Sequence, residues 1–121
     1  MPKQKMIVAG GRDFIDHERM LAEFNNLVAS GFMAPDCELV CGMARGADMT
    51  AYHIFRAHNN PVHVFHPDWD AEPKRAGFIR NAEMGDFADA CIAFWDGQSK
   101  GTKHMIDYMQ RLDKPLTVIR Y

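Results

Sequence analysis

The sequence of 121 residues has no long apolar run, and its charge is not strongly of one sign. A membrane-spanning helix needs about 20 apolar residues in succession, so we expect no membrane partner. The formal net charge of −2 argues against a nucleic-acid partner, although a local basic patch would still allow one. The N-terminal segment enters a strand-like pattern directly and lacks the apolar stretch of a signal peptide. We therefore expect a cytoplasmic protein.

Cysteine is scarce, and the few cysteines present form no recognisable site. Cys37, Cys41 and Cys91 are an odd number, and each lies within or beside an apolar segment. This pattern argues against a disulfide framework and fits a reducing compartment. Cys37 and Cys41 have no matching second pair, so we expect no zinc site and no other metal.

The standard nucleotide-binding motifs are also missing. The segment GGRDFI, which starts at Gly10, is not G-x-G-x-x-G, and the strand-like run that ends at Gly42 has no acidic residue for a ribose. No G-x-x-x-x-G-K-[ST] occurs, which excludes a P-loop of the usual kind. We expect no required cofactor.

A regular alternation of apolar runs and helical periodicity fills the chain. Strands are predicted at Lys5–Gly11, Cys37–Gly42, Pro61–His66, Asp89–Asp96 and Pro115–Arg120, and helices over about 20–28, 47–58, 76–87 and 102–112. Such alternation predicts an α/β fold with a parallel sheet and right-handed crossovers. We expect one domain over residues 1–121, a Rossmann-like doubly wound sheet in the strand order 3-2-1-4-5 with helices on both faces.

Glycine-bearing loops follow three of the predicted strands, and all three fall at one edge of the expected sheet. Glycine lets backbone N–H groups approach a ligand, and helix N-termini attract anions. In doubly wound sheets ligands bind at this carboxyl edge. The predicted ligand-binding residues are Gly10, Gly11, Arg12, Asp13, Gly42, Ala44, Arg45, Gly46, Asp48, Trp69, Arg80, Asn81, Gly97, Ser99, Gly101 and Thr102.

Three carboxylates near these loops, Asp13, Asp48 and Asp96, are the candidate catalytic residues. Each has an alternative role, since Asp13 or Asp16 could cap the first helix and Asp48 the second. Trp69, in the long polar segment after His66, either stacks on a base or covers the core.

Five segments in order along nearly the whole chain resemble the SLOG superfamily, and most closely its YspA-like branch of bacteria and phages. They are GGRDF, CGMARGADMTA, PDW, AGFIRNAEM and AFWDGQSKGT, which begin at Gly10, Cys41, Pro67, Ala76 and Ala93. The resemblance implies a Rossmann-like fold and a nucleotide-related ligand at the strand ends. It is also compatible with a homodimer.

Two better-known relatives imply different functions. Lonely Guy phosphoribohydrolases carry an R-K pair and P-G-G-x-G-T-x-x-E; here Arg80 is matched, Asn81 replaces the lysine and Met105 replaces the catalytic glutamate. Because methionine cannot act as an acid or base, the binding half of the motif is kept and the chemical half is not. The segments CGMARGADMTAYH and FIRN also resemble DNA-processing protein A, which binds single-stranded DNA.

Three hypotheses remain open from the sequence. The first is a protein that binds or senses a nucleotide, with the phosphate among the glycine loops and Trp69 against the base. The second is a nucleotide hydrolase that uses one of the three aspartates, and the third is a single-stranded nucleic-acid binder.

Overall fold

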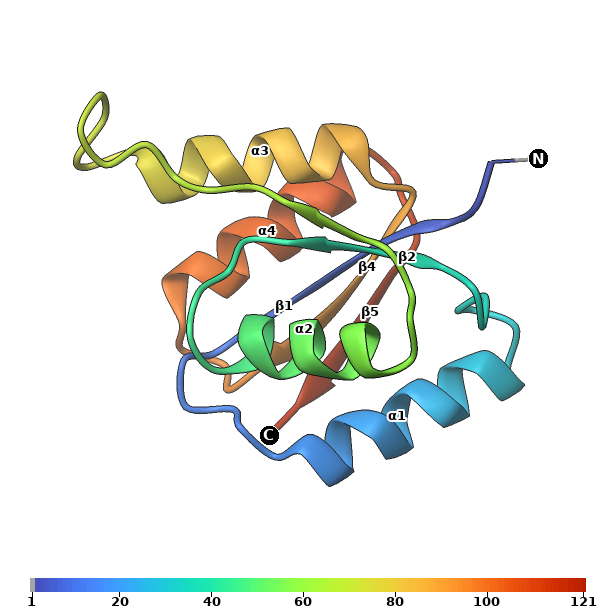
Figure 1. Cartoon of the computed structure of the whole chain (residues 1–121). Helices are drawn as coiled ribbons and strands as arrows, with labels where there is room; N and C mark the ends of the chain where they lie inside the picture. Colours follow the sequence, from blue (N-terminus) through green and yellow to red (C-terminus); the bar gives the residue numbers. More distant parts are fainter. Residues whose placement is uncertain (1) are drawn as a thin grey trace.

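Five parallel strands form the centre of the computed structural model, which describes residues 2–121. Their order is β3-β2-β1-β4-β5 (Figure 1). Strands β2 and β3 are added on one side of β1, and β4 and β5 on the other, so the switch point lies between β1 and β4. The strands are β1 (Lys5–Gly10), β2 (Glu38–Cys41), β3 (Val62–Val64), β4 (Ala90–Trp95) and β5 (Leu116–Arg120). The helices are α1 (His17–Ala29), α2 (Ala47–Ala57), α3 (Ala76–Phe87) and α4 (Lys100–Arg111). The predicted α/β fold and strand order are confirmed.

The central strands are apolar on both faces because a helical layer covers each face. In β1, Met6 and Val8 belong to the core under α1 and α2, whereas Ile7 belongs to the core under α3 and α4. This alternation follows the two-residue period of a strand. Figure 1 shows α1 and α2 below the sheet and α3 and α4 above it.

The start of helix α4 and the cap of helix α2 differ from the sequence-based expectation. Helix α4 begins at Lys100, two residues before the predicted Thr102, because the Ser99 side chain accepts a hydrogen bond from the Thr102 N–H and caps the helix. Asp16 caps α1 by accepting from the Arg19 N–H. Helix α2 has Gly46 at its cap position and no side-chain cap, so Asp48 does not serve as one.

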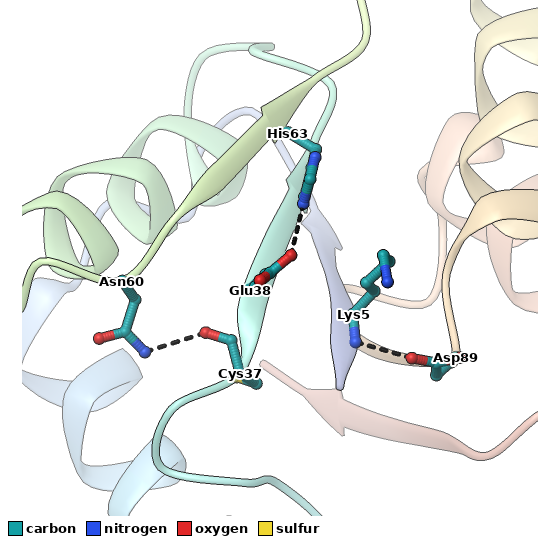
Figure 2. Close-up of polar contacts among 6 residues, drawn as sticks. All are labelled: Lys5, Cys37, Glu38, Asn60, His63 and Asp89. Atoms are coloured by element: carbon teal, nitrogen blue, oxygen red, sulfur yellow. Dashed lines mark hydrogen bonds and ion pairs between the residues drawn. The ribbon is translucent and has the colours of Figure 1, made fainter. Parts of the chain in front are cut away.

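At the amino edge of the sheet, where the parallel strands begin, polar groups are paired with one another within the protein (Figure 2). The Lys5 N–H donates to Asp89 Oδ2 at 2.8 Å, and His63 Nε2 lies 2.7 Å from Glu38 Oε1. Asn60 Nδ2 donates to the Cys37 carbonyl at 2.9 Å. These contacts join the starts of neighbouring strands and fix their register.

The three cysteines are buried and free. Burial raises the pKa of Cys37 and of Cys41 to about 12, so both thiols stay protonated near neutral pH. Across residues 2–121, no group of three or more His, Cys, Asp or Glu side chains is placed to hold a metal ion. Within the same range, no helix is long and apolar enough to cross a membrane.

Candidate functional site

The loops after β1, β2 and β4 meet at the carboxyl edge of the sheet, as the glycine pattern predicts. The Gly11 N–H donates to the Phe94 carbonyl at 3.2 Å, and the Ala47 N–H donates to the Gly11 carbonyl at 3.1 Å. Gly46 has a φ of +85°, and a Cβ there would lie 2.4 Å from the Gly11 oxygen. Only glycine therefore lets the first and second loops pack this closely.

Two adjoining clefts open at this edge. The cationic cleft has a volume of about 690 Å³. Its walls are Arg12, Gly42, Met43, Ala44, Arg45, His66, Pro67, Trp69, Lys74, Gly77, Phe78, Arg80, Asn81 and Gly101. The acidic cleft has a volume of about 450 Å³ and is lined by Ala9, Gly10, Gly11, Arg12, Asp13, Ala44, Asp48, Arg80, Asn81, Met84, Asp96, Ser99, Gly101, Thr102 and Met105. Arg12 and Arg80 belong to both clefts and mark their junction.

Arg80 is held in place by backbone and side-chain contacts. Its Nη1 donates to the Gly42 carbonyl at 2.8 Å, and its Nε donates to Asn81 Oδ1 at 3.2 Å. Burial lowers the pKa of Arg80; the negative charge of the neighbouring Asp48 opposes this effect, and the positive charge of Arg12 adds a smaller decrease. Among residues 2–121, neither arginine forms an ion pair within 4.0 Å. The exposed guanidinium of Arg12 and the remaining donors of Arg80 are thus available to an anion.

Asp48 is a buried carboxylate at the wall of the acidic cleft. Its side chain is 5% exposed, and Oδ2 accepts from the Ala44 N–H at 3.3 Å. Desolvation raises its pKa from 3.8 to about 6, against the opposing effects of Arg80 and of the Ala44 and Gly42 amides. Its pKa therefore lies closer to neutral pH than that of an ordinary aspartate.

The other two candidate aspartates are bound to neighbouring groups. The Tyr121 hydroxyl donates to Asp13 Oδ1 at 2.6 Å, and burial together with this hydrogen bond raises the pKa of Tyr121. Asp96 Oδ1 accepts from the Gln98 and Ser99 N–H groups, both at 2.8 Å, and these bonds lower the pKa of Asp96. Asp96 is therefore a fixed anion, which is poorly suited to act as a general acid.

The loop from Gly97 to Thr102 is less open to a phosphate than its glycines suggest. Asp96 and the Ser99 side chain take the N–H groups of Gln98, Ser99 and Thr102. Among the described residues, the amides of Lys100 and Gly101 have no acceptor. A Cβ at Gly97 would lie 2.2 Å from Arg120 Nη2, so this glycine permits packing and lines neither cleft.

Asn81 connects α3 to the start of α4. Its side chain is 7% exposed, and Nδ2 donates to the Gly101 carbonyl at 3.2 Å and lies 3.3 Å from His104 Nδ1. Met105, which stands where Lonely Guy enzymes have their glutamate, is 1% exposed and lies at the wall of the acidic cleft. Arg80, Asn81 and Met105, which stand at the positions of the R-K pair and the glutamate, thus line one cleft. Asn81 and Met105 supply neither the positive charge nor the carboxylate of the Lonely Guy residues.

The structure brings most of the predicted ligand-binding residues together. Fourteen of the sixteen line one or both clefts, while Gly46 and Gly97 lie behind them and allow close packing. Trp69 is 54% exposed and lines the cationic cleft, so it does not cover the core. Whether these residues bind a ligand stays a prediction.

Sequence reasoning missed three side chains of the site. Lys74 and Phe78 line the cationic cleft, and Phe78 also packs on the His104 ring with centroids 4.5 Å apart. Both belong to the polar segment around Trp69 and Arg80. Phe78, an aromatic residue in the first turn of α3, was the signal from which this part of the cleft could have been predicted. Tyr121 follows β5 directly, so its place at a strand end was the clue to its contact with Asp13.

A family model described as the YspA, cpYpsA-related SLOG family matches residues 4–71. The chain belongs to this SLOG family. The matched region holds the first two glycine loops and Trp69, which line the two clefts. Membership in the SLOG family implies a nucleotide-related ligand that is bound or processed.

A phage protein supports this assignment. The chain is 37% identical over 84 residues to the Gene 61 protein of Mycobacterium phage D29. The alignment covers 64% of this SLOG chain and 67% of the phage protein. No solved structure gives a significant match.

Proposed function

We propose that this SLOG-family protein binds or senses a nucleotide or nucleotide-derived ligand across the two clefts. The observation that carries the proposal is the pair of guanidinium groups, Arg12 and Arg80, at the junction of the clefts. Asp48 partly balances the charge of Arg80, whereas the exposed Arg12 adds a second positive charge that an anion can neutralise. A phosphate group is the anion that best matches paired guanidinium forks.

Aromatic side chains beside the cations favour a nucleotide over a free phosphate. Trp69 and Phe78 are both exposed and line the same cleft as Arg45 and Lys74. Nucleobases stack on exposed aromatic rings, and such stacking contributes about 1–3 kcal/mol per base. Met105 supports binding without hydrolysis because a buried thioether supplies no acid or base.

Isothermal titration calorimetry with nucleoside mono- and diphosphates tests this proposal. The variant Arg12→Ala removes an exposed guanidinium, so we expect nucleotide affinity to fall about tenfold or more. Arg56→Ala, which removes an exposed arginine from the last turn of α2, is the matched control and should bind as the unmodified protein does. Absence of heat with every nucleotide at about 1 mM, or equal weakening by both variants, would contradict the proposal.

A second candidate function, nucleotide hydrolysis, is favoured by one observation. Asp48 lies at the wall of the acidic cleft with a pKa raised to about 6, as a general acid or base near neutral pH requires. Incubation of the protein with each bound nucleotide, followed by chromatography of the products, separates the two functions. Turnover that is lost in Asp48→Asn would establish hydrolysis; intact nucleotide after prolonged incubation would exclude it.

We further propose a cytoplasmic location, supported by three buried free thiols that a reducing compartment preserves. No cofactor is required under this proposal, because the nucleotide is itself the ligand. A homodimer stays a prediction from the resemblance, and light scattering at several protein concentrations measures it directly.

A further inference from the structure

The two clefts differ in the charge of their walls. Four cations, Arg12, Arg45, Lys74 and Arg80, line the cationic cleft, and no carboxylate is among its lining residues within 2–121. The acidic cleft has three carboxylates in its walls, and its two cations are the arginines of the junction. A ligand that spans both clefts therefore needs a negatively charged part in the cationic cleft and a part without negative charge in the acidic cleft.

In the acidic cleft, the loop after β4 already binds a carboxylate of the protein itself, that of Asp96. The Asp96 carboxylate accepts the N–H groups of Gln98 and Ser99, as a phosphate oxygen would in a phosphate-binding loop. A second anion placed there would meet Asp13 and Asp48 as well. The phosphates are thus expected at the junction and in the cationic cleft, rather than among Gly97 to Thr102.

Asp48 shows what the acidic cleft can recognise. It is 5% exposed and lines the cleft; the Ala44 N–H donates to it at 3.3 Å, and the Gly42 amide and Arg80 also act on it. A carboxylate offers about four lone-pair sites, so acceptor capacity remains for donors from a ligand. Uncharged hydroxyl groups, such as those of a sugar, supply such donors without adding charge.

We propose that the ligand is a nucleoside diphosphate esterified to a second, uncharged group that carries hydroxyls. Its phosphates lie between Arg12 and Arg80, its base lies against Trp69 and Phe78, and the hydroxyls of the second group bind the carboxylates of the acidic cleft. Cleft volumes of about 690 and 450 Å³ accommodate these two parts. This inference rests on the proposed function, because it names the class of ligand for the same site.

Matched ligands that differ in one group test the inference on the unmodified protein. UDP lacks the second group, UDP-glucose carries a neutral hydroxylated sugar, and UDP-glucuronate replaces one CH₂OH of that sugar with a carboxylate. We expect UDP-glucose to bind about tenfold more tightly than UDP, and UDP-glucuronate to lose at least about tenfold relative to UDP-glucose. ADP and ADP-glucose repeat the comparison with a purine.

A variant assigns the discrimination to the acidic cleft. Asp13→Asn removes one of its carboxylate charges at an exposed position, so the preference for UDP-glucose over UDP-glucuronate should fall several-fold. Asp36→Asn, an exposed aspartate outside both clefts, is the control and should leave the preference unchanged.

The outcomes separate this inference from the proposed function. If UDP, UDP-glucose and UDP-glucuronate bind equally, the inference is overturned while nucleotide binding stands. If the two aspartate variants change the preference equally, the acidic cleft is not the source of discrimination and the inference again fails. If none of the five nucleotides binds at about 1 mM, both the inference and the proposed function are overturned.

Discussion

The two edges of the sheet treat their polar groups differently. At the amino edge, Glu38 contacts His63, and the Lys5 backbone contacts Asp89, so these groups are paired within the protein (Figure 2). At the carboxyl edge, Arg12 and Arg80 repel one another, and neither forms an ion pair within 4.0 Å among the described residues; the nearby Asp48 offsets part of the Arg80 charge. Close pairing contributes to stability, whereas two cations beside a cleft without close ion-pair partners suit an anionic ligand.

The two edges also differ in whether side chains or closely packed backbone hold them together. The amino edge uses the side chains of Glu38, His63, Asn60 and Asp89 for its contacts, and loss of one such hydrogen bond has a modest cost. The carboxyl edge depends on glycines whose backbone lies against other backbone, as at Gly46 and Gly10. Three substitutions test this difference, ordered by expected effect.

The largest effect is expected from Gly46→Ala. A Cβ there would lie 2.4–2.5 Å from backbone atoms of Gly11 and Arg12, in a conformation with a φ of +85°. With a ψ of −127°, Gly46 lies in a region that essentially only glycine adopts; strain of about 1–3 kcal/mol and overpacking of about 1–3 kcal/mol together lower the free energy of unfolding by roughly 4 kcal/mol. Urea unfolding followed by circular dichroism measures the change.

Gly31→Ala is the matched control, because Gly31 has a φ of +84° and no atom within 4 Å of an added Cβ. Only the backbone strain applies, so we expect a loss of about 1 kcal/mol. Equal losses in the two variants would mean that the close packing of the first two loops contributes nothing.

The second prediction concerns Asp48 and pH. Because its folded pKa of about 6 lies above its ordinary value of 3.8, its stabilising contribution is complete below about pH 4 and is lost as pH rises through 6. The shift corresponds to about 3 kcal/mol, and Asp48→Asn should remove this pH dependence. Urea unfolding of both proteins between about pH 4 and pH 8 measures it. Parallel stability profiles would show that Asp48 does not titrate as described.

The smallest effect is expected at the amino edge, from Glu38→Gln. The hydrogen bond from His63 lowers the pKa of Glu38, so the pair stabilises the fold above the ordinary glutamate pKa of 4.5 and loses this effect as pH falls further. The variant should lose a little stability near neutral pH and none in acid, with nucleotide binding unchanged. Weaker nucleotide binding in this variant would break the proposed separation of the two edges.

The fold was accessible from sequence because its signals are local. Apolar runs marked every strand, and the helical spacing marked every helix. The start of α4 was misplaced by two residues, although Ser99 and Thr102 already had the spacing of a capped first turn. Glycine loops at three strand ends correctly located the edge at which the clefts open.

The charge pattern of the site was not accessible in the same way. That Asp96 occupies the amides of Gln98 and Ser99 depends on the loop conformation, which glycine positions alone do not specify. The contact of Tyr121 with Asp13 joins residues 108 positions apart. The cationic cleft forms only where the segment that carries Trp69 and Lys74 meets Arg12 and Arg45 from two other loops, far away in the sequence.

A ¹⁵N-resolved NMR titration with UDP-glucose compares the two edges in one experiment. The account predicts shifts for the Trp69 indole and the Gly101 and Gly42 amides at the carboxyl edge, and none for Glu38 or His63 at the amino edge. Shifts confined to the amino edge, or no shift anywhere at about 1 mM ligand for any of the five nucleotides, would contradict it.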